Sequence, residues 1–214
     1  RELQDNGNEI KNELLQLKQR HIDPSSAKSL FLDAKEYLSK PIGETTSKDR
    51  AVSFYVVNKC SFSGLTESSS FSKQASDSNF SLRGIEKLPE YSKLISRWKI
   101  TNYSYETLKS DDILTFVYAD PPYDIKDVLY GNKGNMHKGF DHARFADEMD
   151  SWLCNVMISY NNHPDICERF LEWCQYDYDH TYTMRSTGTY MSDQKERREL
   201  ILTNYGKFRG SCTP

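Results

Sequence analysis

The sequence predicts an α/β fold in which a helix-covered sheet is joined to a mostly helical region. In the second half of the chain, apolar strand-like runs alternate with helical segments, an order typical of mainly parallel sheets. In the first half, helical spacing of apolar residues dominates. With 214 residues, 37% of them hydrophobic, the chain is long enough for one large domain or for one domain with an inserted subdomain.

Two amphipathic helices are expected at the start of the chain. Residues 1–20 carry apolar side chains at helical spacing among charged ones. After a break that contains Pro24, Ser25 or Ser26 is expected to cap a second helix that continues through Leu38.

The next segments are less regular. Residues 51–58 are continuously apolar, which fits a strand and a buried helix equally. Residues 61–81 are rich in serine and predict a long loop, of the kind that is usually functional or disordered. Residues 83–97 have helical spacing despite Pro89, and residues 98–101 predict a short strand.

The second half predicts three strands and two helices. Residues 113–119 are nearly all apolar and β-rich, as a buried parallel strand should be. Residues 156–160 and 200–205 predict two further strands, and residues 141–153 and 164–175 predict the helices.

Composition leaves nucleic-acid binding open and gives no sign of a membrane protein. The net charge is −3, so bulk charge does not argue for a nucleic-acid partner, although a local basic face can coexist with an acidic remainder. No apolar run approaches the ~20 residues of a membrane span, and no signal-peptide pattern is present. The five cysteines contain no CxxC and the histidines show no metal-site spacing, so we expect reduced thiols, no metal and a cytoplasmic location.

The sharpest motif is Asp120-Pro121-Pro122-Tyr123, which directly follows the predicted strand at 113–119. Open α/β sheets bind their ligands at the carboxyl ends of such strands. The plain alternative is an ordinary Pro-Pro turn after a strand.

The motif suits chemistry on an exocyclic adenine amine, whose lone pair is delocalised into the ring. The Asp120 carboxylate and the Pro121 carbonyl can each accept one N–H of the amine and so localise that lone pair. The Pro121-Pro122 step fixes the backbone that holds the carbonyl. Tyr123 offers a ring face, and stacking of a base on an aromatic ring contributes roughly 1–3 kcal/mol. Such a base must first leave the duplex.

In four ordered stretches the chain resembles the D12 class of adenine-N6 DNA methyltransferases, which includes the Dam methylases. One stretch resembles the beginning of the family's DNA-recognition region, one its catalytic motif, one the strand and turn that follow, and one its closing strand. These stretches are residues 50–64, 116–123, 158–162 and 199–205.

The resemblance implies a Rossmann-like methyltransferase sheet with an inserted, mostly helical target-recognition subdomain. It implies a helical remnant of the catalytic domain at 1–45, target recognition at 46–100 and the catalytic domain at 101–214. The implied methyl donor is S-adenosylmethionine, and the implied partner is double-stranded DNA. The candidate DNA contacts, each with an equally weighted structural alternative, are Arg50, Asn58, Lys59, Ser61 and Ser63; Phe62 is expected in the core.

The chain departs from the family in the part that binds most of the donor. Family members begin with a Gly-rich strand and loop, whereas this chain contains no GxG. We therefore expect a second polypeptide, or the remainder of a longer protein, to supply that half. Donor contacts from this chain are expected at Asp120 and Phe140, although core packing is the favoured role of Phe140.

Two other functions compete with adenine methylation. One is a non-catalytic DNA-binding or partner-binding remnant that does not bind the donor. The other is an RNA guanine-N2 methyltransferase, since a related Asn/Asp-Pro-Pro-Tyr motif occurs in that class. The recognition-like stretch before the motif argues against the RNA enzyme.

Overall fold

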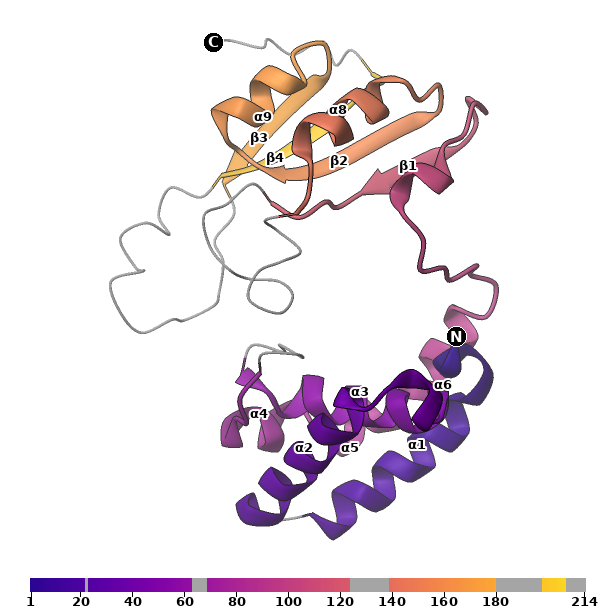
Figure 1. Ribbon diagram of the computed structural model, residues 1–214, viewed down its shortest axis with the longest axis vertical. Helices are drawn as coiled ribbons and strands as arrows, with labels where there is room; N and C mark the ends of the chain where they lie inside the picture. Colours follow the sequence, from indigo (N-terminus) through magenta and orange to yellow (C-terminus); the bar gives the residue numbers. More distant parts are fainter. Residues whose placement is uncertain (22, 63–68, 124–138, 180–197, 207–214) are drawn as a thin grey trace, which may run out of the picture. The chain divides into compact units, whose positions relative to one another are not determined.

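The computed structural model describes residues 1–21, 23–62, 69–123, 139–179 and 198–206. The chain divides into two compact units, Arg1–Asn102 and Tyr103–Pro214, and each has its own apolar core (Figure 1). The division lies next to the boundary expected between residues 100 and 101. The boundary expected between residues 45 and 46 falls inside the first unit, because the helices on both sides of it contribute to one core.

The described elements of the first unit are helices, apart from one isolated β-bridge between Ser61 and Phe71. Its core gathers one apolar face from each long helix, with Leu14, Phe31 and Val56 nearly or fully inaccessible. None of the helices that the structure describes is long and apolar enough to cross a membrane. The elements are α1 (Glu2–Arg20), α2 (Pro24–Ser39), η1 (Ile42–Glu44), α3 (Ser47–Cys60), α4 (Lys73–Ser78), α5 (Leu82–Glu86) and α6 (Leu88–Leu94).

Helix α1 packs closely on α6 because a glycine lies at the contact. A Cβ built on Gly7 would stand 2.6 Å from the Cβ of Ser92. The Ser92 hydroxyl donates to the backbone oxygen of Gln4 at 3.0 Å. The Gln4 side-chain amide donates in return to the carbonyls of Ile95 and Trp98 at 2.6 and 2.8 Å. The end of α6 is thus tied to the first turn of α1.

Several local expectations for this unit need correction. Residues 51–58, for which both strand and buried helix were expected as possibilities, are helical, since they lie within α3. Helix α2 is capped by Asp23, whose carboxylate accepts from two backbone N–H groups; the expected cap at Ser25 or Ser26 is wrong. Phe62 is not in the core, because 57% of it is exposed.

The remaining differences concern secondary structure. Residues 98–101 form no strand, and the expected loop at 61–81 contains α4. The expected helix at 83–97 is two short helices, α5 and α6, separated at Lys87. Pro89 stands in the first turn of α6, where its missing N–H costs nothing.

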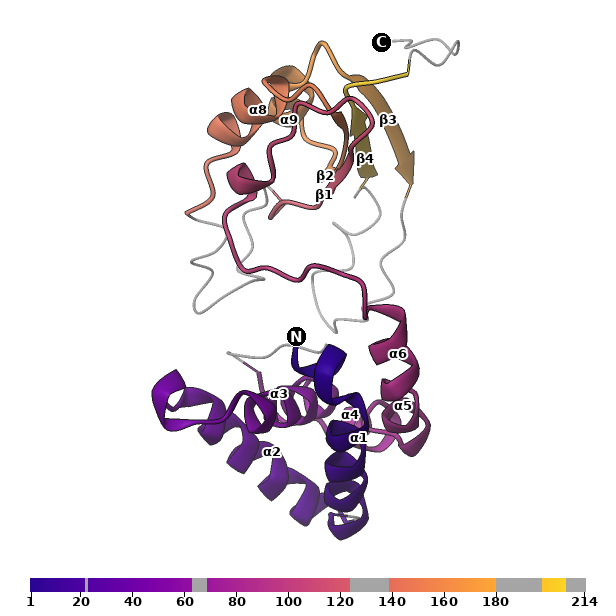
Figure 2. The same ribbon diagram turned by 90° about the vertical axis from the view of Figure 1, so that its right-hand side faces the viewer.

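The second unit contains a four-stranded sheet in the order β1-β2-β4-β3. Helices α8 and α9 lie on one face of it (Figures 1 and 2). Their residues Phe145, Met149 and Ile166 join a core with apolar residues of β2 and β4. The elements are η3 (Tyr105–Leu108), β1 (Phe116–Ala119), α8 (His142–Asp150), β2 (Asn155–Asn161), α9 (Pro164–Arg169), β3 (Cys174–Asp179) and β4 (Arg198–Thr203).

The α/β class is confirmed, but the sheet is mixed instead of mainly parallel. Strand β1 pairs parallel to β2, whereas β4 pairs antiparallel to both β2 and β3. The helix expected at 164–175 is also wrong in its second half. Helix α9 ends at Arg169, and Cys174 begins strand β3.

The other face of the sheet carries exposed aromatic side chains. Val117 and Ala119 of β1 point to the core, so the alternating residues Phe116 and Tyr118 point to the opposite face. These two are 55% and 57% exposed. Among the described strands, β1 stands at the edge of the sheet, with β2 as its neighbour.

Candidate active site

Asp120 lies immediately after β1, at the carboxyl end of that strand. The parallel pairing of Ala119 with Ile158 brings Asp120 beside Ser159 of β2. The Ser159 hydroxyl donates to Asp120 Oδ1 at 2.9 Å. Asp120 itself is exposed, whereas Ser159 is buried. The Ser159 hydroxyl of the sheet therefore holds the carboxylate in place, and the carboxylate remains accessible to solvent.

A second hydroxyl extends this contact. Tyr118 Oη lies 2.9 Å from Ser159 Oγ. Because a serine hydroxyl has one proton, and Ser159 gives it to Asp120, Tyr118 must be the donor of the other bond. The order of donation runs from Tyr118 to Ser159 to Asp120. It uses one carboxylate oxygen, and a carboxylate offers roughly four acceptor sites, so Asp120 can accept further N–H groups.

The rest of the motif turns inward from the sheet edge. Pro121 is buried and Pro122 half-buried. The Tyr123 ring packs beside Tyr160, with centroids 6.2 Å apart and planes 31° apart. Its hydroxyl donates to Glu199 Oε2 at 2.7 Å.

The environment of Tyr123 keeps its hydroxyl protonated. Burial raises the pKa of Tyr123 far above its ordinary value. The hydrogen bond to Glu199 and the negative charges of Glu199 and Asp120 raise this pKa further. Tyr123 therefore acts as a permanent hydrogen-bond donor to Glu199.

Phe140 belongs to an aromatic cluster beside the motif. Its ring centroid lies 6.1 Å from Tyr105, 5.4 Å from Phe145 and 5.0 Å from His142. His142 in turn hydrogen-bonds the hydroxyl of Tyr160. Phe140 is partly buried and packs against the core, so the core role expected for it agrees with these contacts. Part of its ring stays accessible for a ligand.

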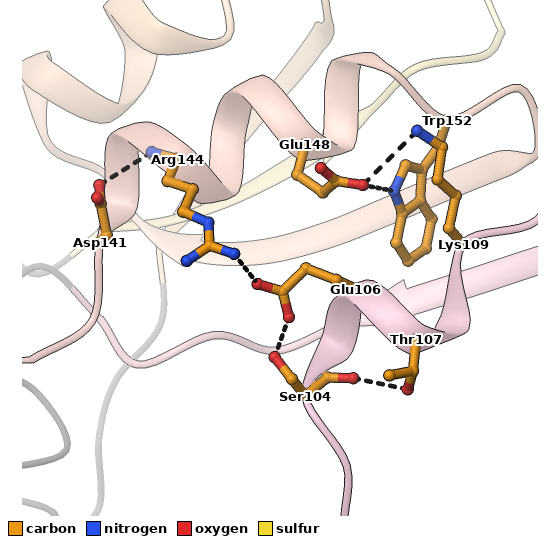
Figure 3. Close-up of polar contacts among 8 residues, drawn as sticks. All are labelled: Ser104, Glu106, Thr107, Lys109, Asp141, Arg144, Glu148 and Trp152. Atoms are coloured by element: carbon orange, nitrogen blue, oxygen red, sulfur yellow. Dashed lines mark hydrogen bonds and ion pairs between the residues drawn. The ribbon is translucent and has the colours of Figure 1, made fainter.

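Polar contacts fix the cluster from the side of η3 (Figure 3). Arg144 of α8 forms an ion pair with Glu106 of η3, with 2.9 Å between Nη2 and Oε1. Glu148 of the same helix accepts from the Trp152 indole N–H at 3.1 Å. Glu148 also forms an ion pair with Lys109 at the end of η3, with 3.6 Å between Oε1 and Nζ. The two ion pairs hold η3 against α8 and so keep Tyr105 against Phe140.

The candidate DNA contacts lie on or beside α3, in the first unit. Arg50 donates to the carbonyls of Leu38 and Lys40 at the end of α2, at 3.3 and 3.2 Å. The Lys59 ammonium lies 5.8 Å from the centre of the Tyr55 ring and is partly exposed.

The serine and asparagine candidates differ in accessibility. Ser61 is fully buried, and its hydroxyl donates to the carbonyl of Asn58 at 3.2 Å, which favours its structural alternative. Asn58 is partly exposed. Ser63 lies outside the described residues. Among the candidates that the structure describes, Lys59 thus keeps an accessible charge at the end of α3.

The residues of the second unit suit a methyl donor only in part. An exposed carboxylate at Asp120 suits the cationic methionine end of S-adenosylmethionine. Phe140 offers a partly accessible ring. In the described part of the chain, no group of histidine, cysteine, aspartate or glutamate residues could hold a metal ion.

A family model described as D12 class N6 adenine-specific DNA methyltransferase matches residues 5–188. The chain belongs to this family. The match covers most of the chain, including the Asp120–Tyr123 motif and, apart from the first residues of α1, the described helices. No curated protein gives a significant match. The activity that characterises D12 methyltransferases is N6 methylation of adenine in DNA, so DNA is the substrate that membership indicates.

Sequence reasoning missed Ser159 and Glu199 as parts of this site. Ser159 lies within the residues that the family model matches and Glu199 lies beyond them, and no local pattern tells which side chain reaches the motif. A weak indication was present. Ser159 interrupts an apolar strand, and Glu199 directly precedes one.

Proposed function

We propose that this D12 methyltransferase transfers a methyl group from S-adenosylmethionine to N6 of an adenine flipped out of duplex DNA. The observation that supports this most strongly is the Asp120 carboxylate, exposed at the carboxyl end of β1 and fixed by Ser159 at 2.9 Å. Enzymes stabilise the charge that develops in the transition state mainly through polar groups that are already in place and need no reorganisation during the reaction.

Each residue of the motif has a separate task in this proposal. Asp120 accepts one N–H of the adenine amine, and the Pro121 carbonyl accepts the other. Tyr123 stacks on the base, which offsets part of the few kcal/mol that unstacking costs. S-adenosylmethionine supplies the methyl group when bound. The chain contributes orientation and electrostatics and needs no metal.

The donor site is proposed to be completed by a polypeptide segment that is not part of these 214 residues. Asp120 and Phe140 would contribute to it from this chain. The edge position of β1 and the exposed rings of Phe116 and Tyr118 support such a segment, because strand edges and apolar faces are ordinarily covered. A second chain or the remainder of a longer protein would serve equally.

DNA binding is proposed for the helical unit, with Lys59 as a phosphate contact at the end of α3, Asn58 beside it and Arg50 near the start of the same helix. Ser61 would act indirectly, by shaping the end of α3. Ser63 remains a candidate contact.

The decisive experiment replaces Asp120 by alanine. We expect methylation of unmethylated genomic DNA by radiolabelled S-adenosylmethionine to fall by at least about 10²–10³-fold, as when a fixed acceptor or donor is removed from other enzymes. Duplex affinity, which depends mainly on phosphate contacts, should stay largely intact. Retained methylation in the variant would refute the role of Asp120.

Asp147→Ala is the matched control, because Asp147 is an exposed acid on α8. Its activity should equal that of the wild type. A wild-type protein that binds duplex DNA but shows no heat of binding with S-adenosylmethionine would instead support the non-catalytic alternative.

A further inference from the structure

Glu199 is a buried carboxylate directly behind the catalytic motif. It lies on β4, opposite Asn161 of β2 and Tyr178 of β3, and only 5% of it is exposed. Acidic side chains are almost never buried to this extent unless a partner compensates the lost hydration. Among the side chains that the structure describes, no lysine, arginine or histidine forms an ion pair with Glu199.

Within the described part of the chain, the hydrogen-bond partner is the Tyr123 hydroxyl, which donates to Glu199 Oε2 at 2.7 Å across 76 positions of sequence. Hydrogen bonds to a charged acceptor are short and roughly twice as strong as neutral ones. The bond is attached at the far end of the tyrosine ring, at the atom that would move most if the ring swung about its side-chain torsions.

A second contact restrains the same ring along its face. Tyr160 lies 6.2 Å away between centroids and has no exposed surface. Its own hydroxyl is hydrogen-bonded to His142. Tyr160 is therefore a fixed support, and Tyr123 is held between this support and the Glu199 carboxylate.

We propose that Glu199 is a positioning residue that locks the Tyr123 ring in the orientation in which it stacks on the target adenine. The proposal rests on the proposed function, since it assigns Tyr123 the flipped base as ligand. Glu199 acts through the ring and touches neither the base nor the methyl donor. A ring fixed before the base arrives loses no further torsional freedom on stacking.

The test uses the protein together with the segment that completes the donor site. The variants are Tyr123→Phe, Glu199→Ala and the conservative Glu199→Gln, whose amide oxygen still accepts a hydrogen bond. We expect Tyr123→Phe and Glu199→Ala each to lower kcat on unmethylated genomic DNA by about tenfold, the effect of losing one hydrogen bond to a charged group. Glu199→Gln should lose less. KM for DNA should change little, because phosphate contacts dominate affinity.

Two further measurements separate positioning from a general loss of structure. The Tyr123→Phe/Glu199→Ala double variant should lose no more activity than the worse single variant, since both changes break one bond. With carbon-13-labelled tyrosine rings, the Tyr123 resonance, identified by its absence from Tyr123→Phe, should shift in Glu199→Gln. Asp150→Asn is the matched control, since Asp150 accepts from the Trp173 indole at 2.5 Å; it should keep wild-type kcat.

Each outcome decides the matter. An unshifted Tyr123 resonance, a fully active Glu199→Ala variant or additive losses in the double variant would overturn the positioning role while the wild type remains an active methyltransferase. A wild-type protein that methylates no DNA even when the segment that completes the donor site is present would overturn the proposed function, and the positioning role with it. In that case, a shifted resonance would still demonstrate the hydrogen bond.

Discussion

At the residue scale, the Asp120 carboxylate depends on a side chain of the neighbouring strand. Ser159 donates to it at 2.9 Å and itself accepts from Tyr118. Ser159→Ala removes the donor without adding bulk. We expect single-turnover methylation to slow by about 10- to 100-fold, as a hydrogen bond to a charged group contributes roughly 1.5–3 kcal/mol.

Two variants calibrate this result. Tyr118→Phe leaves the bond between Ser159 and Asp120 in place, so it should slow the reaction less than Ser159→Ala. Ser151→Ala removes an exposed hydroxyl that donates to the Glu148 carbonyl at the end of α8 and should have no effect. A Ser159→Ala variant as fast as the wild type would show that Asp120 is held by other means.

The sequence identified the residues of the motif but not the side chains that hold them in place. Asp120 to Tyr123 stood out because a Pro-Pro step after an apolar strand is a local pattern. Ser159 and Glu199 reach the motif only through strand pairing, over 39 and 76 positions. Pairing at such separations depends on register, which single-residue patterns do not encode. Phe62, expected in the core, is exposed.

At the element scale, the contact between α1 and α6 depends on Gly7. A Cβ there would come within 2.6 Å of Ser92 Cβ, so Gly7→Ala must displace one helix. Overpacking of this kind costs about 1–3 kcal/mol, and the higher helix propensity of alanine relative to glycine offsets about 1 kcal/mol of that cost. We expect a net loss of about 1 kcal/mol, measured as a lower midpoint of thermal unfolding.

Gly43→Ala is the matched control. A Cβ on Gly43 would meet no atom within 4 Å, and this glycine does not adopt a positive φ. Its unfolding midpoint should equal or slightly exceed that of the wild type. If Gly7→Ala proves as stable as Gly43→Ala, the close approach of α1 and α6 is not what fixes their packing.

The sequence predicted whether an element is a helix or a strand where one hydrophobic pattern dominated over several residues. The two N-terminal helices, β1, β2, β4 and α8 lie where periodicity predicted them, with ends shifted by a few residues. Strand β3 was missed although Cys174–Asp179 alternates Cys or Tyr with Gln or Asp, because the helix expected at 164–175 was extended over its first residues. Its pairing with β4 along the whole strand establishes it as a strand.

At the scale of the whole molecule, the two cores share no residue among those described. We therefore expect the fragment Arg1–Asn102 to fold alone, with helical circular dichroism and one cooperative thermal transition. Under the proposed function it should also bind duplex DNA. Lys59→Ala should weaken that binding and lower the salt dependence by about one released counterion.

Lys48→Ala controls for the lost charge on the same helix. Lys48 lies 3.6 Å from Glu9 and 3.9 Å from Glu13, so neighbouring acids already neutralise it. Its DNA affinity and salt slope should match those of the unmodified fragment. If the fragment folds but does not bind DNA, the helical unit is not the part that recognises DNA.

The overall class followed from sequence, whereas the sheet's topology did not. Alternating strands and helices predicted a mainly parallel sheet, because each crossover was assumed to return the chain in the same direction. Strand β4 instead enters between β2 and β3 and runs against both. The order and direction of strands depend on long-range pairing, which residue periodicity leaves open.

The separation of the two cores bears on how such an enzyme can diversify. Under the proposed function, substitutions that redirect recognition towards another DNA sequence would fall in the helical unit. They would leave untouched the packing that aligns Asp120 and Tyr123. New DNA specificities could then arise through exchange or mutation of the helical unit, while the unit with the sheet keeps its catalytic residues in place.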